Sequence, residues 1–276
     1  MPPMPPATPT GDPSASTDEL VYEIAADGIA TATLNRPAAR NALTLAMYDR
    51  LAEICGGIEA GGPVKALIIT GAGDKAFGAG TDIAAFRHVK TRDEALAYEA
   101  KMEAVLSQIE RTQVPTIAAI AGACTGGGAA IAAVCDLRIT TASLRFGFPI
   151  ARTLGNCLSM NNLGRLAGLI GAARTKEILF TARLIEAAEA LSIGLVSEVV
   201  TDHGALMQRA GALARLVAGH APLTLRATKE ALRRLNDREM RDRQDDDLIA
   251  LCYTSQDFRE GMEAFLGKRK PDWRGV

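Results

Sequence analysis

Residues 114–136, VPTIAAIAGACTGGGAAIAAVCD, constrain the fold of this chain more than any other stretch. Val114 to Ala121 has the apolar, Ile-rich character of a buried strand, and the segment AAIAAVC that follows three glycines is typical of a short apolar helix. A strand that turns through glycines into a helix leaves unpaired backbone N–H groups at the positive end of the helix dipole. Because glycine has no Cβ, a ligand can approach these groups closely. The pattern therefore predicts half of an oxyanion-binding site.

Two other structures are compatible with the same stretch. No charged residue lies between Arg111 and Asp136, a span of 24 residues that is long enough for a membrane helix. Pro115 and the glycines would break such a helix, which argues against a membrane span. The second alternative is a buried core helix whose glycines only allow close packing, and this stretch alone leaves it open.

The composition excludes several classes of protein. The 276-residue chain can build one large domain or two smaller ones, and its net charge of -1 gives no sign of a nucleic-acid or membrane partner. Its five cysteines are odd in number and show no C-x-x-C spacing, and its three histidines form no H-x-x-x-H pair. We therefore expect no disulfide framework and no metal site, and a reducing, cytoplasmic location.

The order of the predicted elements divides the chain into three parts. Residues 1–17 hold half of the twelve prolines and are expected to be a disordered tail. Strands alternate with helices over residues 18–203, beginning with a hairpin at Asp27-Gly28, whereas residues 204–276 read as helix only. This order predicts an α/β core followed by a helical C-terminal region.

A second glycine-rich stretch follows the buried strand predicted at 66–70. It is predicted as a loop over 71–80, with Asp82 in the first turn of the next helix. The run GAGDKA matches the dinucleotide pattern G-x-G-x-x-A, so a nicotinamide-dependent oxidoreductase is an alternative. That pattern must open directly into a helix, however, and here a second glycine cluster intervenes. The N–H groups around Gly80 and Thr81 are instead candidate anion donors.

Five motifs, in this order, resemble the crotonase superfamily, which is the enoyl-CoA hydratase/isomerase family. They are LNRPAARNAL, GAGDKAFGAGTDI, AIAGACTGGGAAIAAVCDLRI, GLVSEVV and DFREGMEAFLGKRKP, and they cover residues 18–271. The resemblance implies a crotonase-type spiral of ββα units, with a C-terminal helical region that forms trimers, often paired into hexamers. It also implies a lyase or isomerase of fatty acid metabolism that acts on an acyl-CoA thioester. Coenzyme A then enters with the substrate, and no separate cofactor is expected.

The resemblance also assigns site residues. Members of the family hold the thioester carbonyl between two backbone N–H groups, and the matching positions are Thr81 and Gly127. Two fixed donors stabilise an enolate or a tetrahedral oxyanion, and the loss of one costs about 3 kcal/mol. The positions that match the acyl-CoA groove are Arg40, Ala42, Ala79, Gly80, Asp82, Ile83, Gly126, Pro149, Ile150, Leu154 and Lys268. Lys268 and Arg269 match a basic pair that approaches the nucleotide, and a solvated surface is the alternative for this pair and for Arg40.

The chain departs from the family at the two positions that carry the glutamates of hydratases. Alanine stands at the first, Ala130, and isoleucine at the second, Ile150. Neither side chain can transfer a proton, so the usual addition of water is in doubt. A non-catalytic acyl-CoA-binding protein on the same fold is therefore the alternative to an enzyme.

The polar loop predicted at 149–162 supplies the remaining candidates for chemistry. Some members of the family place an aspartate in this loop, at positions that match Asn156 or Ser159. Cys157 is a nucleophile only if its pKa is lowered, and a buried, inert thiol is the alternative. These three residues are the candidate side-chain catalysts.

The last helices carry more apolar side chains than a peripheral layer should expose. These residues are Leu223, Leu225, Leu232, Leu235, Leu248, Leu251, Phe258 and Phe265. Large exposed apolar surfaces mark protein interfaces. We therefore expect a homotrimer or a dimer of trimers.

Overall fold

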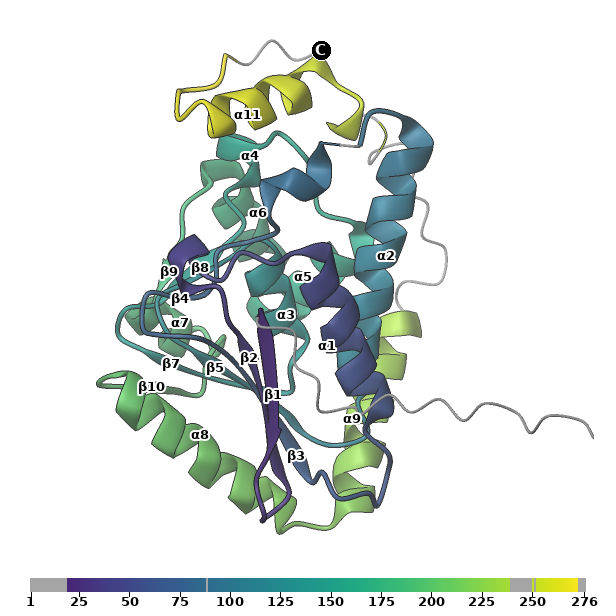
Figure 1. Cartoon of the computed structure of the whole chain (residues 1–276), viewed down its shortest axis with the longest axis vertical. Coiled ribbons are helices and arrows are strands. Elements are labelled where there is room, and N and C mark those ends of the chain that lie inside the picture. The colour runs from purple at the N-terminus through teal and green to yellow at the C-terminus, as the bar shows by residue number, and fades with distance from the viewer. Residues whose placement is uncertain (1–18, 88, 239–249, 251, 273–276) are drawn as a thin grey trace, which may run out of the picture.

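The computed structural model describes residues 19–87, 89–238, 250 and 252–272, which form two β-sheets and the helices around them (Figure 1). In this part of the chain the large sheet has the strand order β1-β2-β3-β5-β7-β10, and the small sheet has the order β4-β6-β8-β9. The strands of the large sheet are β1 (Leu20–Ile24), β2 (Ile29–Leu34), β3 (Ala66–Gly71), β5 (Thr116–Ile120), β7 (Leu137–Thr141) and β10 (Glu198–Val200). Those of the small sheet are β4 (Ala76–Gly78), β6 (Ala123–Thr125), β8 (Arg145–Gly147) and β9 (Ile185–Glu186). The pairs β1–β2 and β8–β9 are antiparallel, and the other pairs are parallel.

The chain steps from the large sheet to the small sheet and then into a helix three times. Strands β3 and β4 lead to α2 (Arg92–Glu110), β5 and β6 lead to α3 (Gly127–Val134), and β7 and β8 lead to α4 (Ile150–Thr153). This repeat is the predicted spiral of ββα units. It brings the ends of β4 and β6 side by side, because these strands pair in parallel.

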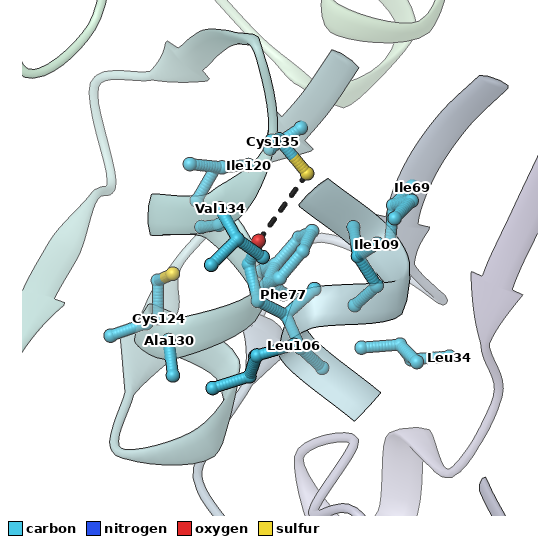
Figure 2. Packing of buried hydrophobic residues seen from close by; sticks show 14 of the residues in the cluster. Leu34, Ile69, Phe77, Leu106, Ile109, Ile120, Cys124, Ala130, Val134 and Cys135 are labelled. Carbon is cyan, nitrogen blue, oxygen red and sulfur yellow. Dashed lines mark hydrogen bonds between the residues drawn. The ribbon is translucent and has the colours of Figure 1, made fainter. Parts of the chain in front are cut away.

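Strand β3 lies in the middle of the large sheet, between β2 and β5, and all of its residues are buried. Successive side chains of a strand point to opposite faces. Leu67 and Ile69 accordingly join the main core, whereas Ala66 and Ile68 join a second cluster on the other face. Figure 2 shows Ile69 in the main core, packed with residues of β4, α2 and α3 such as Phe77 and Leu106.

Helices cover both faces of the large sheet. On the main-core side lie α1 (Leu45–Gly57), α2 and α3, together with α5 (Met160–Ile170), α6 (Ala172–Thr181) and α7 (Ala187–Ser192). The other face is covered by α8 (His203–Ala218), which Figure 1 shows lying across the sheet. The remaining described helices are α9 (Pro222–Arg238), α11 (Gln256–Leu266), and the short 3-10 helices Pro37–Ala39 and Ile83–Phe86. No described helix is long and apolar enough to cross a membrane.

Several local predictions are confirmed. The hairpin is formed by β1 and β2. Thr44 caps the first long helix, α1, by accepting a hydrogen bond from the Met47 N–H. The first C-terminal helix, α8, packs directly on the sheet through buried residues such as Leu206 and Ala210. The predicted tail at 1–17 and most of the helix predicted at 240–254 lie outside the described residues.

Other local predictions are wrong. The expected loop at 71–80 contains strand β4, and Asp82 is the N-cap of the 3-10 helix Ile83–Phe86 instead of a residue of its first turn. The polar loop at 149–162 contains α4. These elements are only three or four residues long, so they leave no periodic pattern that a sequence reading can detect.

Candidate active site

A cleft of about 690 Å³ lies where segments that are far apart in the sequence meet. Most of the residues predicted for the site line this cleft. They are Arg40, Ala42, Ala79, Gly80, Thr81, Asp82, Ile83, Gly126, Gly127, Pro149, Ile150, Leu154, Asn156 and Cys157. Two predicted residues, Ser159 and Lys268, are not part of its wall.

The backbone N–H of Thr81 points away from Leu43, the residue with which the chain at Thr81 forms a parallel bridge. The N–H of Leu43 donates to the Gly80 carbonyl at 2.8 Å, and the Leu43 carbonyl accepts from the Asp82 N–H at 2.8 Å. The Gly80 carbonyl and the Thr81 N–H belong to one peptide unit, and in a trans peptide these groups point in opposite directions. The Thr81 N–H therefore points away from Leu43, and Thr81 lies on the cleft wall.

The same argument applies to Gly127, the first residue of α3. The Gly126 carbonyl accepts from the Ala130 N–H inside the helix, so the Gly127 N–H points out of the N-terminus of α3. Gly126 has a φ of +52°, a conformation that favours glycine and that turns the chain from β6 into the helix. The predicted strand–glycine–helix pattern thus forms, and the helix N-terminus borders the cleft.

The two glycine-rich segments touch each other. A Cβ added to Gly126 would lie 3.3 Å from the Gly80 Cα, and one added to Gly127 would lie 3.1 Å from Thr81 Oγ1. The same Cβ on Gly127 would lie only 1.9 Å from the Tyr48 Oη, so no side chain fits at this position. We call Thr81 and Gly127 the donor end of the cleft.

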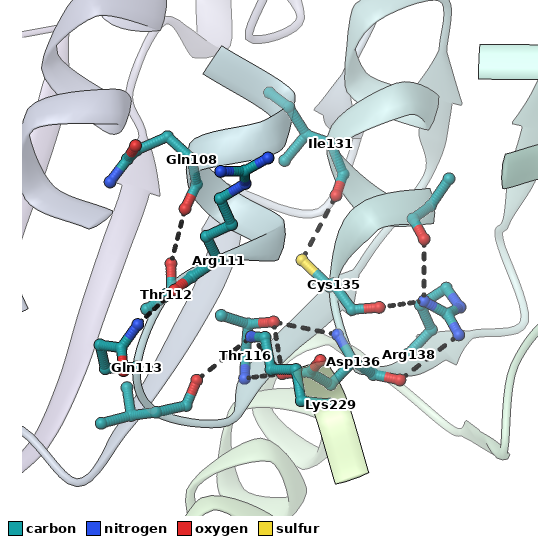
Figure 3. Close-up of polar contacts among 12 residues, drawn as sticks. Gln108, Arg111, Thr112, Gln113, Thr116, Ile131, Cys135, Asp136, Arg138 and Lys229 are labelled. Atoms are coloured by element: carbon teal, nitrogen blue, oxygen red, sulfur yellow. Dashed lines mark hydrogen bonds and ion pairs between the residues drawn. The ribbon is translucent and has the colours of Figure 1, made fainter. Parts of the chain in front are cut away.

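Helix α3 is also held at its C-terminus. Arg138 on β7 donates to the carbonyls of Ala132 at 3.2 Å and Cys135 at 2.5 Å, and its Nε donates to the Leu195 carbonyl at 2.9 Å (Figure 3). The last carbonyls of a helix lack intrahelical donors, and a cation satisfies them while it complements the helix dipole. Arg138 therefore fixes the helix whose other end carries the Gly127 N–H.

A second polar network joins Asp136, which follows α3, to Thr116 at the start of β5. Asp136 Oδ2 accepts from the Thr116 N–H and Oγ1 at 2.8 and 2.9 Å, and from the Lys229 Nζ at 2.8 Å (Figure 3). Lys229 belongs to α9, so this carboxylate links the C-terminal helices to the sheet. The three donors compensate the partial burial of the Asp136 charge.

The loop before Thr81 is held by two side chains. Asn41 is fully buried, and its Nδ2 donates to the carbonyls of Ala72 at 3.1 Å and Ala76 at 2.7 Å. Arg36 forms an ion pair of 2.9 Å with Asp82. The backbone N–H of Ala84, followed by Arg36, holds the pKa of Asp82 below its ordinary value, so this carboxylate stays ionised. Asp82 therefore has a structural role as a cap and ion-pair partner at the cleft edge.

Three hydroxyl groups meet beside the donor end. The Tyr48 Oη lies 2.9 Å from Thr81 Oγ1, and the Tyr98 hydroxyl donates to the same oxygen at 3.3 Å. Burial raises the pKa of both tyrosines, and the negative charge of Glu99 raises both further. Both phenols therefore keep their protons at neutral pH and do not act as bases.

A carboxylate lies on the α2 side of the cleft. The Tyr253 hydroxyl donates to Glu99 Oε1 at 2.5 Å and accepts from the Asn156 Nδ2 at 3.1 Å. Burial and the adjacent carboxylate hold the pKa of Tyr253 well above its ordinary value, so the phenol keeps the proton that it donates. Glu99, Asn156 and Tyr253 all line the cleft, and we call them the carboxylate end.

The carboxylate end rests on an aromatic cluster formed by Phe86, Tyr98, Tyr253 and Phe258. The Tyr253 and Phe258 rings lie 4.9 Å apart, and the Phe86 and Tyr98 rings lie 5.0 Å apart. Phe258 is fully buried in this cluster, so the prediction that it belongs to an exposed interface is wrong. The cluster fastens the C-terminal segment over α2 and thereby positions the Tyr253 hydroxyl.

Helix α2 itself is fixed by Arg165 on α5. Its guanidinium pairs with Glu103 and with Glu110, each at 2.7 Å, and only 10% of its side chain is exposed. Burial alone would raise the pKa of Glu103, but the hydrogen bonds and charge of Arg165 outweigh burial and lower it. This bridge holds the helix that carries Tyr98 and Glu99.

The two positions where hydratases carry glutamate do line the cleft, and they are apolar. Ala130 is buried one turn inside α3, and Ile150 begins α4. Neither can accept or donate a proton. The carboxylates that line the described cleft are those of Asp82 and Glu99.

The other predicted side chains make contacts that indicate structural and not catalytic roles. Ser159 is the N-cap of α5 and accepts from the Asn162 N–H at 3.4 Å. A hydrogen bond with Cys252 and burial raise the pKa of Cys157, which disfavours a nucleophilic thiolate. Arg269 forms an ion pair with Glu260, and Lys268 beside it is exposed.

Sequence reasoning missed Tyr48, Tyr98, Glu99 and Tyr253. In the sequence each is one polar or aromatic residue of an amphipathic helix, where a solvated or core position is the ordinary interpretation. One signal was available for Glu99, because it follows Tyr98 on the apolar side of a helix whose neighbouring turns carry Ala95 and Met102.

Comparison with known proteins agrees with this geometry. The model of the enoyl-CoA hydratase/isomerase family matches residues 25–276. The chain belongs to the enoyl-CoA hydratase/isomerase family. It is 35% identical to a short-chain-enoyl-CoA hydratase of Clostridium acetobutylicum over 244 residues, which are 88% of this chain and 92% of the relative.

Solved structures of the family superpose over nearly the whole chain. An enoyl-CoA hydratase/carnithine racemase from Magnetospirillum magneticum shares 34% identity with a TM-score of 0.75, covering 95% of this chain and 97% of that one. A methylmalonyl-CoA decarboxylase in complex with 2-nitronate-propionyl-CoA shares 26% identity with a TM-score of 0.84, covering 95% of this chain and 100% of that one. The predicted crotonase fold is therefore confirmed.

Proposed function

We propose that this protein is an enzyme that binds an acyl-CoA thioester in the cleft and stabilises the thioester enolate at the donor end. The observation that carries the proposal is the orientation of the Thr81 and Gly127 N–H groups, which point away from their own strand and helix partners at the cleft wall. Two preorganised donors stabilise an oxyanion more than a neutral carbonyl, and so they lower the barrier to enolate formation. Coenzyme A enters as part of the substrate.

The relatives support an acyl-CoA substrate. The names of the Clostridium relative and of the decarboxylase structure both specify a CoA thioester. Ala130 and Ile150 make a hydration that depends on those two positions unsuitable for this chain. The proposal is therefore a lyase or isomerase that reacts through an enolate and takes its proton-transfer group from elsewhere in the cleft.

Hydrogen exchange in deuterated water tests this function directly. The protein is incubated in D₂O with butyryl-CoA, 3-butenoyl-CoA, phenylacetyl-CoA and malonyl-type esters, and the products are analysed by mass spectrometry. Deuterium at the α-carbon of any ester, or loss of carbon dioxide from a malonyl-type ester, would establish that an enolate forms. Binding of the esters without exchange or product would favour the non-catalytic acyl-CoA-binding alternative.

We also propose that the chain assembles as a homotrimer or a dimer of trimers. The α9 side chains Leu223, Leu232 and Leu235 are each more than half exposed, at 66%, 58% and 58%. Leucines of this exposure on one amphipathic helix are typical of a surface that another subunit covers. Sedimentation equilibrium at micromolar concentration tests the assembly, and a monomer would contradict it.

A further inference from the structure

We propose that Glu99 is the proton-transfer group of this site, in place of the two carboxylates that Ala130 and Ile150 replace. The inference rests on the proposed function, because it assigns a base to the enolate chemistry described above. It starts from the location of Glu99, which lies on the cleft wall, on the face of α2 opposite the solvent-exposed residue Ala97.

Glu99 lies close to the donor end as well as to Tyr253. Its neighbour on the helix, Tyr98, donates to Thr81 Oγ1, and the charge of Glu99 contributes to the raised pKa of Tyr48, whose hydroxyl also contacts Thr81. The carboxylate and the two backbone donors therefore face one cavity. An ester whose carbonyl oxygen occupies the donor end presents its α-carbon toward the interior of that cavity.

The hydrogen bonds of the carboxylate end fix the position of the Glu99 carboxylate on the cleft wall. Tyr253 donates to Glu99 Oε1 and accepts from Asn156, so the Tyr253 proton points at the carboxylate. Tyr253 and Asn156 are thus positioning residues, which act on the substrate only through Glu99.

The proton-transfer step balances without any further reactant. A Glu99 oxygen removes a proton from the α-carbon, the C–H electron pair forms the carbon–carbon double bond of the enolate, and the carbonyl π pair moves to the oxygen at the donor end. Glu99 is then a neutral carboxylic acid. Return of the proton to the α-carbon, or to another carbon of a conjugated acyl chain, regenerates the carboxylate. In D₂O the acid exchanges with solvent and returns a deuteron.

The test compares Glu99→Gln with a matched variant on the same helix. Glutamine keeps the size of the side chain and can still accept from Tyr253, but it cannot remove a proton. Asp93→Asn is the control, because Asp93 lies in the first turn of α2 with its side chain 95% exposed. We measure α-deuteration of phenylacetyl-CoA and butyryl-CoA by mass spectrometry, and the Kd of each ester by calorimetry.

We expect Glu99→Gln to lower the exchange rate at least 100-fold, as loss of a general base does, with Kd changed less than threefold. Glu99→Asp should restore part of the rate, and Asp93→Asn should match the unmodified protein. Tyr253→Phe, which keeps Glu99 but removes its donor, should lower the exchange rate roughly tenfold with Kd unchanged. This second variant keeps the test decisive if Glu99→Gln fails to fold.

The outcomes separate this inference from the proposed function. Exchange by Glu99→Gln at the unmodified rate would overturn the role of Glu99 while leaving the enolate chemistry intact. If neither the unmodified protein nor Glu99→Gln exchanges deuterium although both bind the esters, both the role of Glu99 and the enolate chemistry are overturned. If the unmodified protein binds no ester, the proposed function is wrong and the inference falls with it.

Discussion

At the donor end of the cleft the groups that we propose to act are backbone N–H groups, whereas at the carboxylate end they are side chains. Thr81 and Gly127 follow strands β4 and β6, which pair with each other within one sheet. Glu99, Asn156 and Tyr253 come from a helix, a loop and the C-terminal segment, and Glu99 and Tyr253 are 154 positions apart. In the proposed mechanism, therefore, the scaffold fixes the position of the oxyanion, while proton transfer depends on side chains that can change without changing the fold.

The largest effect on stability is expected at Arg165, which fixes the helix that carries Glu99 of the carboxylate end. Arg165→Met leaves Glu103 and Glu110 close together without their shared cation, and breaking a buried ion pair in this way costs about 3–5 kcal/mol. Urea unfolding measures the loss. Arg234→Met is the control, because Arg234 is 73% exposed in its pair with Glu230, and such pairs contribute about 0–1 kcal/mol. Equal losses in the two variants would contradict the structural role of Arg165.

The donor end is expected to tolerate no side chain at Gly127. Gly127→Ala places a Cβ 1.9 Å from the Tyr48 Oη, so either the ring or the helix N-terminus must move. Displacing one oxyanion donor should lower α-deuteration roughly 100-fold. Gly168→Ala is the matched control, because Gly168 lies in α5 with open space around it and alanine favours helix. Full activity of Gly127→Ala would show that the donor end is not used.

A smaller effect is expected from the Tyr48 hydroxyl beside the donor end. Tyr48→Phe removes one hydrogen bond to Thr81 Oγ1, which is worth about 1 kcal/mol, or roughly a fivefold fall in the exchange rate. The ring stays in the core, so stability should change little. Tyr22→Phe on β1 controls for loss of a hydroxyl elsewhere. An unchanged exchange rate in Tyr48→Phe would show that the three hydroxyl groups do not contribute to catalysis.

The smallest effect concerns the pH dependence of stability. The pKa of Glu103 is lower in the folded chain than its ordinary value of 4.5, so its contribution to stability is present above that value. It is lost as the pH falls below that value and through the lower pKa of the folded chain. Urea unfolding across this range should show a steeper loss for the unmodified chain than for Arg165→Met. If the stability of both proteins falls equally with pH, the assigned contribution of Glu103 is contradicted.

The same comparison explains what the sequence can predict. Residues 114–136 encode their strand, turn and helix locally, so the donor end follows from glycine spacing and from helix dipole physics. The 3-residue strands β4 and β6 could not be predicted in this way. Their pairing with neighbouring strands defines them, and their own composition does not. The polar segment at 149–162, predicted to supply candidate catalysts, contributes Asn156 to the cleft wall.

The carboxylate end could not be predicted for a different reason. Glu99 shares the apolar side of α2 with Ala95 and Met102, but this spacing indicates only a buried side, and the packing of α2 decides that this side borders the cleft. Tyr253 matters only because the aromatic cluster brings its hydroxyl to Glu99. Long-range packing of this kind leaves no local spacing in the sequence.

The contact between Tyr48 and Gly127 restricts the order in which this protein can change by mutation. Any residue other than glycine at position 127 collides with the Tyr48 Oη, which lies 1.9 Å from the site of a Cβ. A lineage, or a laboratory library, that gains a side chain at 127 must therefore first replace Tyr48 with a smaller residue. Libraries that vary the two positions together can reach such combinations, whereas those that vary position 127 alone are expected to return only glycine.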